Sequence, residues 1–159
     1  MSRPVTKVRL VPAVLALAGA LALSGCMMAE PVGLAPGLTA RMDTPGAALD
    51  RTQALGMLNS FRATTGAPPL AADAALDTEA QALASLYAST GNAPQKPASA
   101  LHIRVSGGYA NFAETFSGWR NSPSDAAALL DPQAHRAGLG VTYDANSAYG
   151  VYWVLLLAP

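Results

Sequence analysis

The stretch of sequence that determines the fold is the last arm of the chain, Tyr149-Gly150-Val151-Tyr152-Trp153-Val154-Leu155-Leu156-Leu157. Apolar side chains occupy both parities of this run. Successive side chains of a β-strand point to opposite faces of the sheet, so a strand of this kind is covered on both faces. Helices are therefore expected above and below it. We predict an α+β fold: a three-layer α-β-α sandwich with a mainly antiparallel central sheet.

Two further segments are predicted to join this strand in the sheet. Residues 139–143 form the other arm of a hairpin, with the turn at residues 144–148. Residues 101–105 read Leu-His-Ile-Arg-Val and alternate strictly, which is typical of a half-buried strand. Leu101, Ile103 and Val105 then share one face of the sheet, and His102 points away from it.

Helices are predicted where apolar residues recur at helical spacing behind a capping residue. Asp50 is the expected N-cap of the first helix, and Asn111 with Glu114 has the spacing of a capping box. The expected helices cover residues 50–65, residues 73–89, a segment that begins after Asn111, and residues 125–130.

The amino terminus has the pattern of a cleaved export signal. Arg3, Lys7 and Arg9 precede an uncharged apolar run at residues 10–23. This run of about 14 residues is too short to span a hydrocarbon core of about 30 Å. A basic start, a short apolar run and then small residues indicate a secretory signal peptide.

The segment Leu23-Ser24-Gly25-Cys26 resembles the lipobox of bacterial lipoprotein precursors. The resemblance implies that residues 1–25 are a signal peptide. It also implies that Cys26 becomes the amino terminus and carries acyl chains such as palmitate, which anchor the protein to a membrane. Cys26 is the only cysteine, so an internal disulfide is excluded. The alternative is a small core cysteine behind an ordinary secretory signal.

The residue after Cys26 and the charge of the mature chain indicate where the protein is located and which partners are not expected. Met27 rather than an aspartate follows Cys26, which by resemblance to the sorting rule of enteric bacteria favours the outer membrane of a bacterial cell envelope. Removal of the signal leaves seven of the ten basic residues against ten acidic ones, a net charge of about −3. The chain has no basic run, so nucleic acid is not expected as a partner. No second apolar stretch reaches membrane-spanning length.

The mature chain is predicted to hold one domain behind a linker. Residues 26–48 combine the lipidated end with a segment rich in proline and glycine, which indicates a flexible tether. Residues 49–159 have the usual size of a single small domain.

Three segments of this domain resemble the CAP superfamily: the cysteine-rich secretory, antigen 5 and pathogenesis-related 1 proteins, also called SCP domains. The first is Leu58-Asn59-Ser60-Phe61-Arg62, followed by Gly66 and Pro69-Leu70. The second is Phe116-Ser117-Gly118-Trp119-Arg120-Asn121-Ser122-Pro123. The third runs from Gly138-Leu139-Gly140-Val141 through Tyr149-Gly150-Val151-Tyr152-Trp153. The three occur in the family's order and span nearly the whole domain.

The resemblance implies a central cleft in which family members often hold a divalent metal with two histidines and two acidic residues. This chain departs from that pattern. Ser124-Asp125 stands where a histidine follows the Ser-Pro corner, and Ile103-Arg104 stands where an acidic residue precedes an asparagine on the strand. The loop at residues 91–100, which would supply the other histidine, contains none. We therefore expect no metal and no cofactor.

Few residues remain that could support catalysis. The two histidines, His102 and His135, show no ligand spacing, and no serine lies in a Gly-x-Ser-x-Gly turn. Glu114 is either a capping residue or a cleft carboxylate beside Asp125. A metal-dependent envelope hydrolase that uses His102, Glu114, Asp125 and His135 stays as an alternative.

The departures create an apolar strand face where the family has polar ligands. Leu101, Ile103 and Val105 either belong to the core or line a dry groove together with Tyr109. Several family members are credited with sterol or fatty-acid binding. The expected function is therefore a non-enzymatic CAP-like envelope lipoprotein that binds an apolar ligand or an envelope partner, with Glu114 and Asp125 near the site. A purely structural surface lipoprotein is the remaining alternative.

Overall fold

The computed structural model describes residues 33–159, which form one compact unit from Gly33 to Pro159. The predicted signal peptide and the lipidation site at Cys26 lie outside the described residues. Within residues 33–159, no helix has both the length and the apolar character to cross a bilayer. The elements, in chain order, are α1 (Pro36–Thr39), α2 (Arg51–Ala63), β1 (Ala71–Ala72), α3 (Ala74–Thr90), β2 (His102–Gly107), α4 (Phe112–Asn121), α5 (Pro123–Leu129), β3 (Arg136–Tyr143) and β4 (Val151–Ala158).

The sheet has four strands in the order β1-β3-β4-β2. Strand β4 pairs antiparallel with β3 on one side and with β2 on the other, and only the short β1 runs parallel to its neighbour β3. In the register, Val154 of β4 lies between Gly140 of β3 and Val105 of β2. The prediction of a mainly antiparallel sheet is confirmed.

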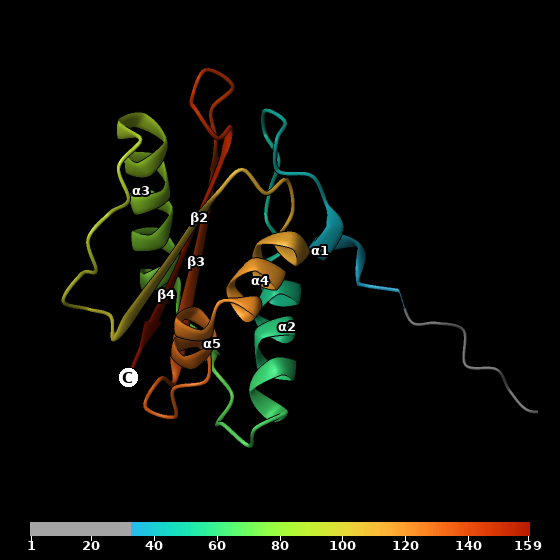
Figure 1. Cartoon of the computed structure of the whole chain (residues 1–159), viewed down its shortest axis with the longest axis vertical. Coiled ribbons are helices and arrows are strands. Elements are labelled where there is room, and N and C mark those ends of the chain that lie inside the picture. Colours follow the sequence, from blue (N-terminus) through green and yellow to red (C-terminus); the bar gives the residue numbers. More distant parts are fainter. Residues whose placement is uncertain (1–32) are drawn as a thin grey trace, which may run out of the picture. The chain divides into compact units, whose positions relative to one another are not determined.

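Helices cover both faces of the sheet, as the last arm of the sequence predicts. Helix α3 lies on one face, and α2, α4 and α5 lie on the other (Figure 1). All eight residues of β4 are buried. Val151, Trp153, Leu155 and Leu157 belong to one core cluster, and Val154, Leu156 and Ala158 belong to the other. The three-layer α-β-α arrangement is confirmed.

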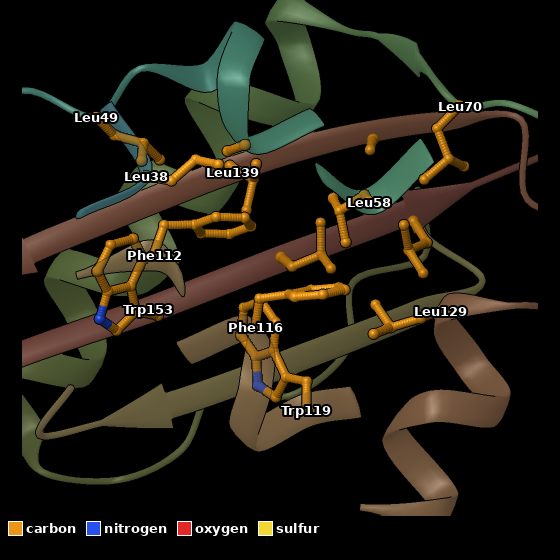
Figure 2. Close-up of a cluster of buried hydrophobic side chains, with 14 of the residues drawn as sticks. Leu38, Leu49, Leu58, Leu70, Phe112, Phe116, Trp119, Leu129, Leu139 and Trp153 are labelled. Carbon is orange, nitrogen blue, oxygen red and sulfur yellow. The ribbon is translucent and has the colours of Figure 1, made fainter. Parts of the chain in front are cut away.

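The core beneath α2 and α4 is aromatic (Figure 2). Phe112 packs against Trp153 with 6.0 Å between ring centroids and against Trp119 with 6.4 Å. Both indoles bond to backbone carbonyls: Trp119 Nε1 donates to Val105 O and Trp153 Nε1 donates to Tyr109 O. A buried indole keeps its hydrogen bond in this way, and the two bonds tie α4 to the strands.

The core beneath α3 is built from small residues. A Cβ added to Gly138 would lie 2.2 Å from the carbonyl carbon of Leu76, and one added to Gly140 would lie 2.3 Å from that of Ala80. Strand β3 therefore rests directly on the backbone of α3, and only glycine fits at these two positions.

Helices α2 and α4 begin at the predicted caps: Asp50 Oδ1 accepts a hydrogen bond from Gln53 N, and Asn111 Oδ1 accepts from Glu114 N. Asp73, predicted as the first residue of its helix, is the N-cap of α3, and its Oδ1 accepts from Leu76 N. Each bond satisfies a backbone donor that the first helical turn leaves unpaired.

Residues 33–48 correct the predicted domain boundary. The sequence indicates a flexible tether up to residue 48, but Leu38 and Met42 are buried in the aromatic core, and Met42 N donates to Ala110 O at 2.7 Å. The domain therefore begins near Gly33 rather than at Leu49. Leu34, Leu38 and Met42 recur at intervals of four residues, but the glycines and prolines around them gave the segment the composition of a tether.

A buried arginine links α2 to the segment after α5. Arg62 is fully buried and donates from Nε to Pro68 O, from Nη1 to Leu129 O, and from Nη2 to the carbonyls of Asp131 and Ala134. Burial lowers the pKa of the guanidinium below its usual range. Four carbonyl dipoles thus solvate this charge in place of water.

Candidate functional site

An open groove of about 680 Å³ lies between α1, α2 and α4. Met57 and Phe61 of α2 form one wall, and Ala113 and Phe116 of α4 form the other. The rings of Phe61 and Phe116 meet edge to face at 5.6 Å. Leu34, at the start of the described chain, is 56% exposed and closes one side. The groove offers mainly apolar surface to a ligand.

The helical repeat explains why these residues face the groove rather than the core. On α2 the buried stripe is Ala54, Leu58 and Arg62, at intervals of four residues. Met57 and Phe61 form the parallel stripe one position earlier, and both are only partly buried. Residues four apart lie one above the other on a helix, so the second stripe borders the first and looks outward.

Charged side chains lie at the rim of the groove. Arg120 is exposed, and its guanidinium carbon lies 5.9 Å from the centre of the Phe116 ring. Glu114 also lines the groove, and its Oε2 accepts a hydrogen bond from Ala110 N at 3.2 Å. An apolar floor with a cation at its edge suits a ligand that has an apolar body and a polar or anionic end.

Of the six residues predicted to bind a ligand, Glu114 alone lines this groove. Ile103 and Val105 pack against the core cluster under α3, and Leu101 packs against the aromatic cluster. Tyr109 is 40% exposed, and its ring lies against Gly118 of α4. The expected groove on the strand face is therefore corrected, because Ile103 and Val105 are partly buried against the core cluster under α3 and do not line the groove between α1, α2 and α4.

The other face of β2 carries two ion pairs. His102 Nε2 lies 2.6 Å from Asp131 Oδ2, and Arg104 Nη1 lies 3.5 Å from Asp125 Oδ1. The hydrogen bond with His102, together with one from Gln133 N, holds the pKa of the Asp131 carboxyl below its usual range. His102 points away from Ile103 as expected. Asp125 lies here rather than in the groove.

The metal site implied by the family does not fit the residues present. Asp125 faces a guanidinium, Asp131 is bonded to His102, and Glu114 serves the turn before α4. His135 is exposed, its backbone pairs with Ala158 and Ala71, and β4 lies between it and His102. Within residues 33–159, no three His, Cys, Asp or Glu side chains converge as metal ligands would. The structure therefore does not unite His102, Glu114, Asp125 and His135 as the hydrolase alternative requires.

The sequence does not reveal the groove because its walls come from three separate segments. Leu34 lies in the predicted tether, and the helical spacing places Phe61 in a single apolar stripe with Leu58. The one sequence feature that indicates the groove is the width of the apolar stripe on this helix. An apolar arc that includes residues 54, 57, 58 and 61 is wider than one core contact requires.

Comparison with known families agrees with the architecture. A model of CAP, the cysteine-rich secretory protein family, matches residues 55–157. The match begins within α2 and ends in β4, so it covers both walls of the groove. No curated protein matches the sequence at a significant level.

Several solved structures share the fold at low sequence identity. An outer surface protein from Borrelia burgdorferi is 16% identical, with a TM-score of 0.57, over 69% of this chain and 92% of that one. MpPR-1i is 17% identical, with a TM-score of 0.58, over 69% and 86%. An extracellular protein from Bacillus anthracis that contains an SCP domain is 17% identical, with a TM-score of 0.56, over 68% of this chain and 40% of that one. At these identities the likeness is one of fold, shared with outer-surface and extracellular bacterial proteins.

Proposed function

The chain belongs to the CAP family, and from that premise we propose that it is a lipid-anchored envelope protein whose non-catalytic domain binds an apolar ligand between α1, α2 and α4. The observation that carries this proposal is the open groove of about 680 Å³ with Met57, Phe61 and Phe116 along its walls. Met57 and Phe61 are only partly buried and Leu34 beside them is exposed, and such apolar surface costs free energy in water unless something covers it.

The proposed ligand is amphipathic. The apolar part lies along Met57, Phe61 and Phe116, and the polar end lies near Arg120, the basic residue at the rim. A fatty-acid-like molecule has this chemistry, and its burial at about 25 cal/mol per Å² of apolar surface favours binding without any reaction.

The proposal has no catalytic step because Asp125, Asp131, Glu114 and His102 have other partners. Asp125 and Asp131 face basic side chains of β2, and Glu114 accepts from a backbone N–H. General acid–base catalysis requires such a group within reach of a bound substrate. Among the described residues that line the groove, Glu114 is the only one with a carboxylate, and none is a histidine.

Ligand binding is tested with a fluorescent fatty-acid analogue and the purified full chain. Ala113→Trp places an indole in the groove, and we expect it to lower the affinity by at least about tenfold, which corresponds to about 1.4 kcal/mol. Ala82→Trp is the matched control, because Ala82 is an exposed alanine of α3 on the other side of the sheet. Equal binding by both variants, or no binding by the unmodified chain, would contradict the groove as the ligand site.

The anchor is tested separately in cells that produce the full chain. Growth with labelled palmitate should label the protein in the membrane fraction, and Cys26→Ser should abolish both the label and the membrane association. An unlabelled mature protein would contradict the lipid anchor but would leave the groove proposal standing, since the ligand assay does not depend on lipidation.

A further inference from the structure

Strand β2 presents two basic side chains to α5 and to the loop that follows it. His102 and Arg104 lie two residues apart, so they share the face that looks away from α3. Arg104 pairs with Asp125 in the first turn of α5, and His102 pairs with Asp131, just after α5 ends. The edge strand is thus joined to both ends of this helix.

The two pairs are only partly accessible to water. The side chains of His102 and Asp131 are 27% and 26% exposed, and those of Arg104 and Asp125 are 22% and 28% exposed. Water and salt screen such charges less than they screen charges on the open surface. Arg104 Nε is buried and has no hydrogen-bond partner, so the contact of this guanidinium with Asp125 is mainly electrostatic.

Arg62 adds a third basic side chain to the same segment. Its Nη1 donates to Leu129 O at the end of α5, and its Nη2 donates to the carbonyls of Asp131 and Ala134. Asp131 therefore contacts two basic side chains, His102 through its carboxylate and Arg62 through its backbone. Residues 123–134 are held against α2 and β2 by three basic side chains.

The resemblance places one metal ligand at the position of Ile103 and another at that of Asp125, after the Ser-Pro corner. Ile103 is apolar and packs under α3, whereas Asp125 faces Arg104 on the other side of β2. We propose that side-chain pairs replace the metal ion between β2 and α5: Arg104 with Asp125, and His102 with Asp131, join the strand to the helix and close the contact between them.

The electrostatics of the site support this replacement. A divalent cation near Asp125 would meet the permanent charge of Arg104, and one near Asp131 would have to displace His102 at 2.6 Å. Asp125 already has a counter-charge and Asp131 already has a hydrogen-bond partner, so the free energy that a metal ion gains from these two carboxylates is reduced. This closure is independent of ligand binding in the groove between α1, α2 and α4.

The experiment measures thermal unfolding of the purified full chain in EDTA and in excess Zn²⁺. The unmodified protein should have the same Tm in both. Arg104→Gln should lower the Tm by about 5 °C in both solutions, because Asp125 loses its counter-charge. Arg41→Gln is the matched control: Arg41 pairs with Asp43, but its side chain is 67% exposed, so the Tm should not change.

Charge reversal keeps the proposal testable if a single variant folds poorly. Arg104→Glu sets two carboxylates against each other and should lower the Tm further in EDTA. The double variant Arg104→Glu/Asp125→Arg should recover most of that loss, because it restores an opposite pair. A double variant no more stable than Arg104→Glu, an Arg104→Gln protein as stable as the unmodified chain, or a native Tm that rises with Zn²⁺ and falls with EDTA would each overturn the proposal.

Discussion

On the α3 side of the sheet, glycine and alanine bring two backbones into contact, whereas on the opposite side aromatic rings and a buried arginine separate the helices from the strands. Gly138 and Gly140 leave no room for a side chain between β3 and α3. The other side holds Phe112, Trp153 and Arg62, together with the groove and both ion pairs of β2. One face of the same sheet thus gives close packing, and the other gives the varied surface that carries the proposed binding site.

The largest expected effect comes from adding one methyl group to the close-packed side of the sheet. In Gly140→Ala the new Cβ would lie 2.3 Å from the carbonyl carbon of Ala80, so α3 or β3 must move. We expect a loss of more than about 3 kcal/mol of unfolding free energy, measured by urea denaturation. Gly56→Ala is the control, because a Cβ at Gly56 of α2 meets no atom within 4 Å. It should stabilise by about 0.5–1 kcal/mol; equal effects would show that contact with α3 is not the cause.

On the aromatic side, the largest expected effect comes from Arg62. Arg62→Met keeps the length of the side chain but removes the donors to four backbone carbonyls. We expect a loss of about 3 kcal/mol in the same denaturation experiment, because several of those carbonyls stay buried without a partner. Arg120→Met makes the same chemical change at an exposed position and should cost less than about 0.5 kcal/mol. A cost for Arg62→Met as small as that of the control would mean that water replaces the guanidinium.

The smallest of the three effects concerns the pH dependence of the His102–Asp131 pair. The pKa of Asp131 is lowered in the folded protein, so the unfolded chain binds more protons and stability falls as the pH drops below the ordinary carboxyl value of about 3.9. The pair therefore stabilises the fold above that pH and ceases to do so as the pH falls through the folded-state pKa of Asp131. The stability advantage over His102→Gln should shrink from pH 5 to about pH 2. His135→Gln, at an exposed histidine, should follow the unmodified protein throughout.

The layers and helix starts could be predicted because their signals are local. Residues 151–157 are apolar at both odd and even positions, which predicts a strand covered on both faces. Asp50, Asp73 and Asn111 cap the helices that follow them. Each inference needs only a few neighbouring residues and one rule of geometry.

The groove and the domain boundary depend on contacts that the local sequence does not carry. Leu38 and Met42 lie in a segment rich in glycine and proline, and they become buried only because α4 and the loop before it receive them. Strand β1 has two alanines and no strand signature. The alternation of residues 101–105 shows that one face of β2 is apolar, but it does not show what packs against that face. That depends on the order of the strands, so the sequence could not decide between a core and a groove.

Because Leu38 is buried in the domain, the linker between the proposed anchor and the folded unit is shorter than the sequence predicts. Seven residue steps separate Cys26 from Gly33, and a fully extended chain covers at most about 3.6 Å per residue, so this length of chain spans at most about 25 Å. Leu34, which closes one side of the groove, follows Gly33. With the proposed lipid on Cys26, the domain would sample only the layer of solvent next to its own bilayer, where lipids that leave the membrane are at their highest local concentration.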